Sequence, residues 1–192
     1  MTLQNLLIDL DQAIIQSTCC QQAVDGTCAV LRQYSNQDLE IPERLRQTTT
    51  AGCYARHLVH LKDGDGYCVV AMVWSPGQGT AVHDHDGTWC VEGCLEGKLD
   101  VTSFRVVEED APGHIRLARE SVVAIGQGEV GSLIPPFEHH KIHNGYTQPA
   151  MTLHVYGKEL RQCTRYREEN GDWFRAEKVD LSYTTVPEAI SA

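Results

Sequence analysis

The sequence predicts a mainly β protein in which a barrel follows a helical N-terminal cap. Up to about residue 50 the apolar residues recur at helical spacing, whereas after Gly52 short apolar runs rich in Val, Tyr, Thr and Trp alternate with turn residues. Many short strands at such spacing are typical of an all-β sandwich or barrel. Because 192 residues suit one domain, we expect a single domain, with residues 1–50 as the cap and 51–180 as the barrel.

The cap is expected to hold two helices and the start of a third. An amphipathic helix is predicted over residues 3–16, and a second between Asp25 and Tyr34. Ile41-Pro42-Glu43 is typical of a helix start with Pro at the first position. The apolar positions that predict the first helix are Leu3, Leu6, Leu7, Leu10 and Ile14.

The barrel strands are predicted from apolar runs that are separated by Gly, Pro and Asp. Turn signals such as Asp63-Gly64-Asp65-Gly66 and Ser75-Pro76-Gly77 divide them. The predicted strands are residues 54–61, 67–74, 89–95, 99–107, 122–126, 130–134, 151–157 and 161–167.

The charge balance excludes some partners. There are 16 Lys and Arg against 26 Asp and Glu, which gives a formal net charge of −10 and argues against nucleic acid or an anionic membrane surface. No stretch approaches the ~20 apolar residues of a membrane span. Met1 to Ile15 carries two Asp and no basic region, so it does not resemble a signal peptide, and we expect a cytoplasmic protein with reduced cysteines.

A candidate metal site centres on His83-Asp84-His85. Five residues separate it from Gly77, and four residues separate it from Cys90. Side chains at i and i+2 of a strand lie on one face, so on a strand both histidines can point into the barrel and bind one ion. A third ligand has to come from another strand. The candidates for it are His139, His140 and His143.

This spacing resembles the first cupin motif, Gly-x5-His-x-His-x4-Glu-x6-Gly, with Cys90 in the Glu position. The second cupin motif ends Pro-x-Gly-x2-His-x3-Asn; Pro135, His140 and Asn144 fit it, while Phe137 replaces the Gly. The fit selects His140 as the third ligand and leaves His139 as the alternative. It implies a cupin-type β-barrel (jelly roll) behind the N-terminal helices.

Three imidazoles without a carboxylate suit zinc, iron, copper or nickel. Because the ligands are neutral, the full charge of a divalent ion stays available to incoming anions, which favours binding of a thiolate. The missing Glu disfavours a zinc- or manganese-dependent isomerase.

From about Tyr54 to Arg165 the sequence resembles the type I cysteine dioxygenase family. The resemblance implies one Fe(2+) per chain on His83, His85 and His140, and an activity that converts a small thiol to a sulfinic acid with both atoms of O2. The segments that carry it are Tyr54-Ala55-Arg56, His83-Asp84-His85, Trp89-Cys90 and Thr152-Leu153-His154-Val155-Tyr156.

Thr152, His154 and Tyr156 match the family's Ser-His-Tyr relay and are the candidate catalytic residues. They alternate along one predicted strand, so all three face inward. A hydroxyl bonded to an imidazole that is bonded to a phenol would fix the imidazole tautomer and aim the phenol at the iron. Cys90 matches the cysteine that some members join to the relay tyrosine through a thioether, although a small core cysteine is the alternative.

The substrate is expected to be a small thiol carboxylate. Arg56 matches the arginine by which cysteine-specific members hold the substrate carboxylate, which favours L-cysteine. Gly157 and Arg165 instead match the 3-mercaptopropionate branch, and two arginines suit a thiol with two carboxylates such as mercaptosuccinate. A non-catalytic metal-binding cupin is the alternative outside enzymes. The sequence leaves the oligomeric state open.

Overall fold

The computed structural model describes residues 1–48, 52–64 and 66–187. The expected boundary between cap and barrel at residues 50 and 51, and Asp65 of the predicted turn, lie outside the described residues. No described helix is long and apolar enough to cross a membrane.

Two helices form the N-terminal cap, as predicted. Helix α1 spans Leu3–Ile15 and begins after Thr2, whose hydroxyl oxygen accepts the Asn5 backbone N–H at 3.3 Å. Helix α2 spans Cys20–Ser35 and starts earlier than expected, because its buried face includes small residues that the apolar spacing did not reveal. Pro42 immediately precedes a short 3-10 turn, η1 (Glu43–Leu45), so it caps that turn and does not start a longer helix.

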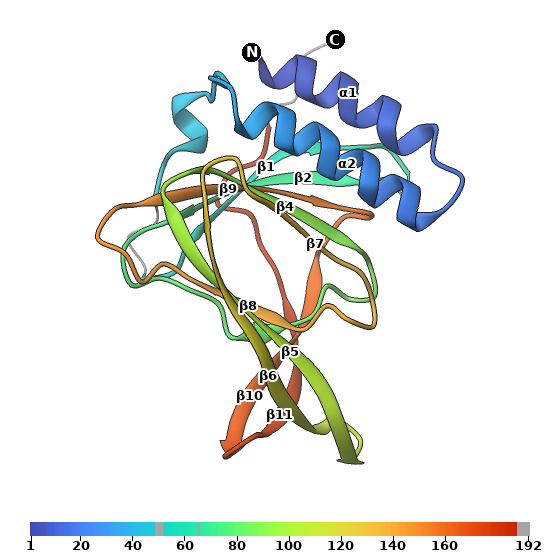
Figure 1. The fold of residues 1–192 in the computed structure, drawn as a ribbon, viewed down its shortest axis with the longest axis vertical. Helices are drawn as coiled ribbons and strands as arrows, with labels where there is room; N and C mark the ends of the chain where they lie inside the picture. The colour runs from blue at the N-terminus through green and yellow to red at the C-terminus, as the bar shows by residue number, and fades with distance from the viewer. Residues whose placement is uncertain (49–51, 65, 188–192) are drawn as a thin grey trace.

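A five-stranded antiparallel sheet lies beneath these helices (Figure 1). Its strand order is β1-β2-β9-β4-β7, and β9 pairs with both β2 and β4. The strands are β1 (Ala55–Leu61), β2 (Cys68–Trp74), β4 (Cys90–Glu96), β7 (Val130–Leu133) and β9 (Ala150–Tyr156).

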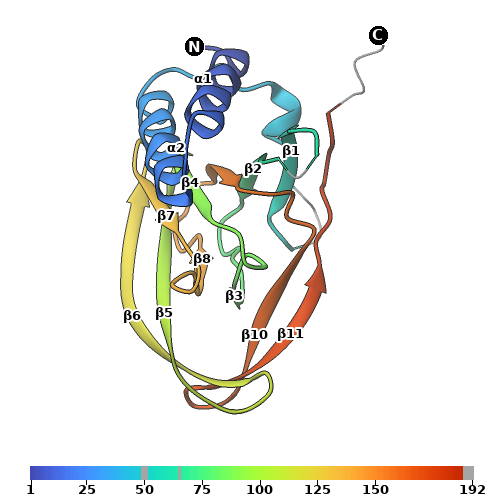
Figure 2. The same cartoon turned by 90° about the vertical axis from the view of Figure 1, so that its right-hand side faces the viewer.

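Six further strands close into a ring of order β10-β11-β6-β5-β8-β3. The long hairpins β5–β6 and β10–β11 extend away from the helices, as Figure 2 shows. The mainly β, cupin-type barrel with N-terminal helices is therefore confirmed. The ring strands are β3 (Val82–His83), β5 (Lys98–Ala111), β6 (His114–Gly126), β8 (His140–His143), β10 (Gln162–Asn170) and β11 (Trp173–Asp180).

The apolar runs did not predict strands β3, β8 and β11. The first two are short and carry histidines, so neither forms an apolar run. Strand β11 is mostly half-buried and carries four charged residues, and its pairing with β10 and β6 rather than its own composition holds it extended.

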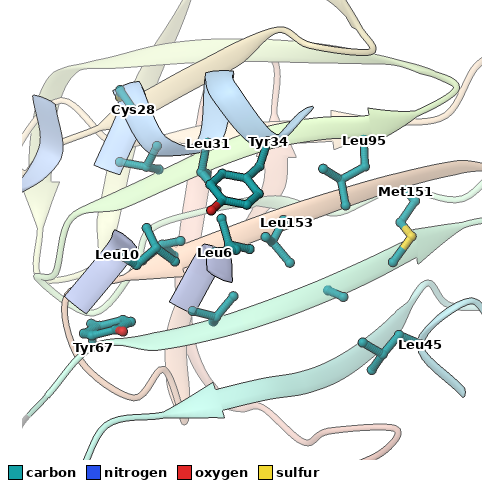
Figure 3. Close-up of a cluster of buried hydrophobic side chains, with 14 of the residues drawn as sticks. Leu6, Leu10, Cys28, Leu31, Tyr34, Leu45, Tyr67, Leu95, Met151 and Leu153 are labelled. Carbon is teal, nitrogen blue, oxygen red and sulfur yellow. The ribbon is translucent and has the colours of Figure 1, made fainter. Parts of the chain in front are cut away.

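Two apolar clusters lie on opposite faces of the five-stranded sheet. The outer cluster joins Leu6 and Leu10 of α1 and Leu31 of α2 to Leu153 of β9 (Figure 3). The inner cluster fills the space towards the ring and includes Trp74 of β2. Strands β2 and β9 are thus buried on both faces; the run of β2 is continuously apolar, whereas the inner face of β9 carries Thr152 and His154.

Candidate metal centre

Three histidines converge between the five-stranded sheet and the ring. His83 ends β3 and His140 begins β8, directly opposite it in register, while His85 follows β3 after one residue. One nitrogen of each ring lies within 4.8 Å of those of the other two. The structure therefore brings together the three predicted ligands, although the expectation that His83 and His85 share one strand was wrong.

A turn, not a strand, carries His85 inward. The side chain of Asp84 holds this turn, because its Oδ1 accepts the backbone N–H groups of Thr164 at 2.8 Å and of Asp86 at 3.1 Å. Asp86 itself has a positive φ of 51°. The carboxylate thus adds to the backbone hydrogen bond that Asp84 N–H donates to the Thr164 carbonyl at 3.1 Å.

The outer nitrogens of the three rings face hydrogen-bond acceptors. Nδ1 of His83 lies 3.1 Å from the Ala81 carbonyl, and Nδ1 of His140 lies 3.0 Å from the Glu138 carbonyl. Nδ1 of His85 lies 3.3 Å from the Glu138 carboxylate, which also accepts the His85 backbone N–H at 2.9 Å. A proton on each Nδ1 leaves each Nε2 lone pair free for a metal.

Burial keeps His83 and His140 in the neutral form that binds metal. Desolvation, followed by the neighbouring His85, lowers the pKa of His83 to about 3. Desolvation also lowers the pKa of His140 well below its ordinary value, and His83 adds to the effect. Three ring nitrogens fit a divalent first-row metal such as iron or zinc.

The neighbouring histidines lie elsewhere. His139 hydrogen bonds through Nε2 to the Tyr166 hydroxyl at 3.2 Å and is not part of the group of three. His143 is exposed at the end of β8. Of the three candidates for the third ligand, the geometry brings His140 into the group.

The predicted relay residues share the inner face of β9. The Thr152 hydroxyl lies 2.8 Å from Nε2 of His154, and it accepts the indole N–H of Trp74 at 2.9 Å. No hydrogen bond joins His154 to Tyr156 among the described residues; their rings stack at 15° with centroids 6.0 Å apart. Side chains two residues apart on a strand run parallel, which places these rings face to face.

Cys90 lies opposite Tyr156 in the pairing of β4 with β9, and both side chains are buried. The thiol sulfur is also 4.0 Å from Nδ1 of His154. Desolvation raises the pKa of the thiol and of the phenol well above their ordinary values, so both groups keep their protons at neutral pH.

The sequence interpretation missed a buried carboxylate, Glu92. It follows Cys90 by two residues on β4 and therefore faces inward as well. Its Oε2 lies 3.5 Å from Nδ1 of His154 and 3.9 Å from Nε2 of His140. Desolvation raises the pKa of Glu92 to about 7. Strand alternation from Cys90 was the signal that could have found it.

A cavity of about 270 Å³ opens beside the three histidines, and Arg56, Arg165 and Tyr156 also line it. The Arg56 guanidinium is buried and donates to the carbonyls of Ser182 at 3.1 Å and Leu160 at 3.4 Å. Arg165 is exposed, and its guanidinium has no hydrogen bond or ion pair within the described part of the chain.

Gly157 has a packing role that is independent of substrate. A Cβ at this position would overlap the indole of Trp89 and the hydroxyl of Thr88. The close approach of β9 to the segment before β4 thus requires glycine here. The residue therefore gives no information on the choice between thiols.

Solved structures of related architecture share little sequence with this chain. One is an uncharacterized conserved protein with a double-stranded β-helix domain from Klebsiella pneumoniae, at 15% identity and a TM-score of 0.48, covering 64% of this chain and 87% of that one. Another is oxalate oxidase in complex with glycolate, at 16% identity and a TM-score of 0.44, covering 62% and 59%.

Curated relatives are closer in sequence. Cysteine dioxygenase type 1 of Bos taurus is 27% identical over 123 residues, and that of Danio rerio is 25% identical over 120 residues. Each match covers 62% of this chain and 58% of the relative, so the chain spans somewhat more than half the length of the relatives it matches.

Fold and site together define a cupin with three inward-facing imidazoles at one candidate metal centre. The family model for cysteine dioxygenase type I matches residues 12–169, which is most of the chain. The chain belongs to this family.

Proposed function

We propose that the protein is an iron(II)-dependent thiol dioxygenase that oxidises a small thiol carboxylate to its sulfinic acid with O2. The observation that carries the proposal is the group of three histidine ring nitrogens beside a cavity that is also lined by a tyrosine and two arginines. Membership of the cysteine dioxygenase type I family supports the same chemistry.

His83, His85 and His140 would hold one iron(II) through Nε2. When bound, the iron supplies open positions and electrons through which a thiolate and dioxygen can react. The protein's own residues then position and shield the reactants. Tyr156 keeps its proton because its pKa is raised by burial, so its hydroxyl serves as a hydrogen-bond donor at the cavity wall.

The proposal extends to a thioether between Cys90 and Tyr156, which lie opposite each other in register. A bond from Sγ to the ring carbon beside the hydroxyl forms as the thiol hydrogen and one ring hydrogen leave. Dioxygen, the proposed co-substrate, accepts the two electrons and two protons. Peptide masses after exposure to iron, thiol and O2 should show a linked pair lighter by two hydrogens, and Cys90→Ala should lack it.

L-Cysteine is the preferred substrate, with Arg56 as the partner of its carboxylate. Two carbonyl bonds occupy only part of the five N–H donors of that guanidinium, which leaves donors for a carboxylate. Removing the partner of a buried carboxylate costs about 2–5 kcal/mol. Arg56→Ala should therefore lose activity on cysteine severely, while Arg165→Ala should lose far less.

The guanidinium of Arg165, which has no partner among the described residues, favours a second candidate, a thiol with two carboxylates such as mercaptosuccinate. For that substrate both arginine replacements should be severe. With 3-mercaptopropionate, which has one carboxylate, only one of the two arginine replacements should cause a large loss of activity. Steady-state kinetics of both variants on the three thiols distinguish these cases, and unchanged kinetics of Arg56→Ala with cysteine would contradict the preferred substrate.

Metal analysis combined with oxygen uptake across a panel of small thiols tests the proposal as a whole. We expect one iron per chain and uptake of one O2 per thiol. A non-catalytic metal-binding cupin would bind metal without thiol-dependent uptake, and that outcome would overturn the proposal.

A further inference from the structure

Glu92 is a buried carboxylate for which the proposed reaction has no stated use. On β4 it lies opposite His154 of β9 on one side and Gly131 of β7 on the other. The residue is 3% exposed, and its Oε2 has no hydrogen-bond partner within the described residues. An ionised carboxylate in such a place requires a partner, because an unpaired buried charge costs several kcal/mol.

Two ring nitrogens lie within 4 Å of Oε2 of Glu92, and the structure distinguishes between them. Nε2 of His140 is 3.9 Å away, but the Nδ1 of that ring faces the Glu138 carbonyl and carries the proton. Its Nε2 is therefore a lone pair and cannot donate. Nδ1 of His154, at 3.5 Å, is the remaining donor.

The hydrogen bonds on the other side of His154 are compatible with a proton on Nδ1. Trp74 can only donate, so its N–H uses a lone pair of the Thr152 oxygen. The Thr152 hydrogen is then available to donate to Nε2 of His154, 2.8 Å away. When Glu92 is ionised, the opposite tautomer would turn the Nδ1 lone pair towards the carboxylate, and these two facing acceptors would repel.

We propose that Glu92 is a positioning residue that accepts the Nδ1 proton of His154 and thereby fixes the tautomer and orientation of that ring. The donor chain then runs from Trp74 through Thr152 and His154 to Glu92. The 3.5 Å separation exceeds an ordinary hydrogen bond, and a shift of Oε2 by about 0.5 Å brings it into range.

This arrangement changes the expected relay. The Nδ1–H of His154 donates its hydrogen bond to Glu92 rather than to Tyr156. The phenol hydroxyl is therefore available to groups in the cavity, where the Tyr156 ring lies 5.5 Å from that of His85. That consequence for the reaction rests on the proposed function, whereas the hydrogen bond itself does not.

Nitrogen-15 NMR of the full chain with labelled histidine tests the tautomer directly. Zinc in place of iron keeps the loaded protein diamagnetic, and the spectrum of His154→Gln identifies the His154 signals by their loss. We expect a protonated Nδ1 and an unprotonated Nε2. A wild-type spectrum with the proton on Nε2 would overturn the proposal.

Two variants separate positioning from packing. Glu92→Gln keeps an acceptor oxygen and should retain the wild-type tautomer, whereas Glu92→Leu removes the acceptor and should give mixed tautomers at His154. Unchanged His154 signals in Glu92→Leu would contradict the role. Spectra of metal-free protein repeat the test without any metal, so its failure and a failure of the proposed function are distinguishable.

Discussion

The two faces of β9 are buried to the same degree but differ in chemistry. Met151, Leu153 and Val155 face the helices, where they meet other apolar side chains (Figure 3). Their neighbours Thr152, His154 and Tyr156, equally buried, face the ring and the three histidines. Burial has opposite consequences on these two faces.

On the outer face, burial removes apolar surface from water and stabilises the fold. On the inner face it removes water from groups that need partners, so it lowers the pKa of His154 to about 3 and raises that of Glu92 to about 7. We infer that the outer face sets stability and that the inner face sets chemistry. Variants on the outer and inner faces of β9 test whether stability and chemistry are separated in this way.

The largest expected effect is at the metal centre. Replacing His83, His85 or His140 with Ala removes one of three ring ligands and should abolish metal binding and activity, as measured by metal content and oxygen uptake. His139→Ala is the matched control, because that side chain bonds to Tyr166 outside the group, and it should keep both. Full metal occupancy in His140→Ala would contradict the ligand assignment.

The next effect in size concerns the outer face. Leu153→Ala leaves a cavity beneath the helices and should lower the free energy of unfolding by about 2–5 kcal/mol, as measured by denaturant unfolding. The folded variant should still bind metal. Its inner-face neighbour Thr152→Val should lose activity at a smaller cost in stability. If Leu153→Ala impaired metal binding without lowering the free energy of unfolding, the outer face would affect the metal site directly, and the proposed division between the two faces would be wrong.

The smallest effect lies at the sheet edge, where α1 meets the turn before β2. Asp11 accepts hydrogen bonds from Lys62 at 2.9 Å and Tyr67 at 2.9 Å, and the Lys62 bond lowers its pKa. Because Asp11 is partly exposed, Asp11→Asn should cost under about 1 kcal/mol.

The sign of the pH dependence at Asp11 follows from the lowered pKa. The stabilisation is present above the ordinary pKa of 3.8 and is lost as pH falls through the lower folded value. Unfolding curves of wild type and Asp11→Asn should therefore converge in acid. A difference that grew towards low pH would contradict this assignment.

The sequence predicted the apolar strands of the barrel because their pattern is local. The apolar pattern missed strands β3 and β8 because pairing with β10, with β5 and with each other, not their composition, makes them extended. The motif spacing selected His140 over His139, and the structure brings that ring to the group. Glu92 was missed because a carboxylate was sought only at the position of Cys90, whereas the chain carries it two residues further along the same face.

For the relay, the sequence predicted the shared face of its three residues but not the hydrogen-bond partner of His154. Alternation along β9 places Thr152, His154 and Tyr156 on one face, but it does not tell which neighbour receives the imidazole proton. That depends on Trp74 and on Glu92, which belong to the adjacent strands β2 and β4. Cross-strand register, which the sequence alone does not give, decides it.

Product analysis under labelled dioxygen tests the central claim most directly. Iron-loaded protein is incubated with L-cysteine, 3-mercaptopropionate or mercaptosuccinate under ¹⁸O2, and the product is examined by mass spectrometry. We predict a sulfinate that carries two labelled oxygen atoms from one consumed O2. A disulfide as the sole product, or oxygen atoms that come from water, would contradict it.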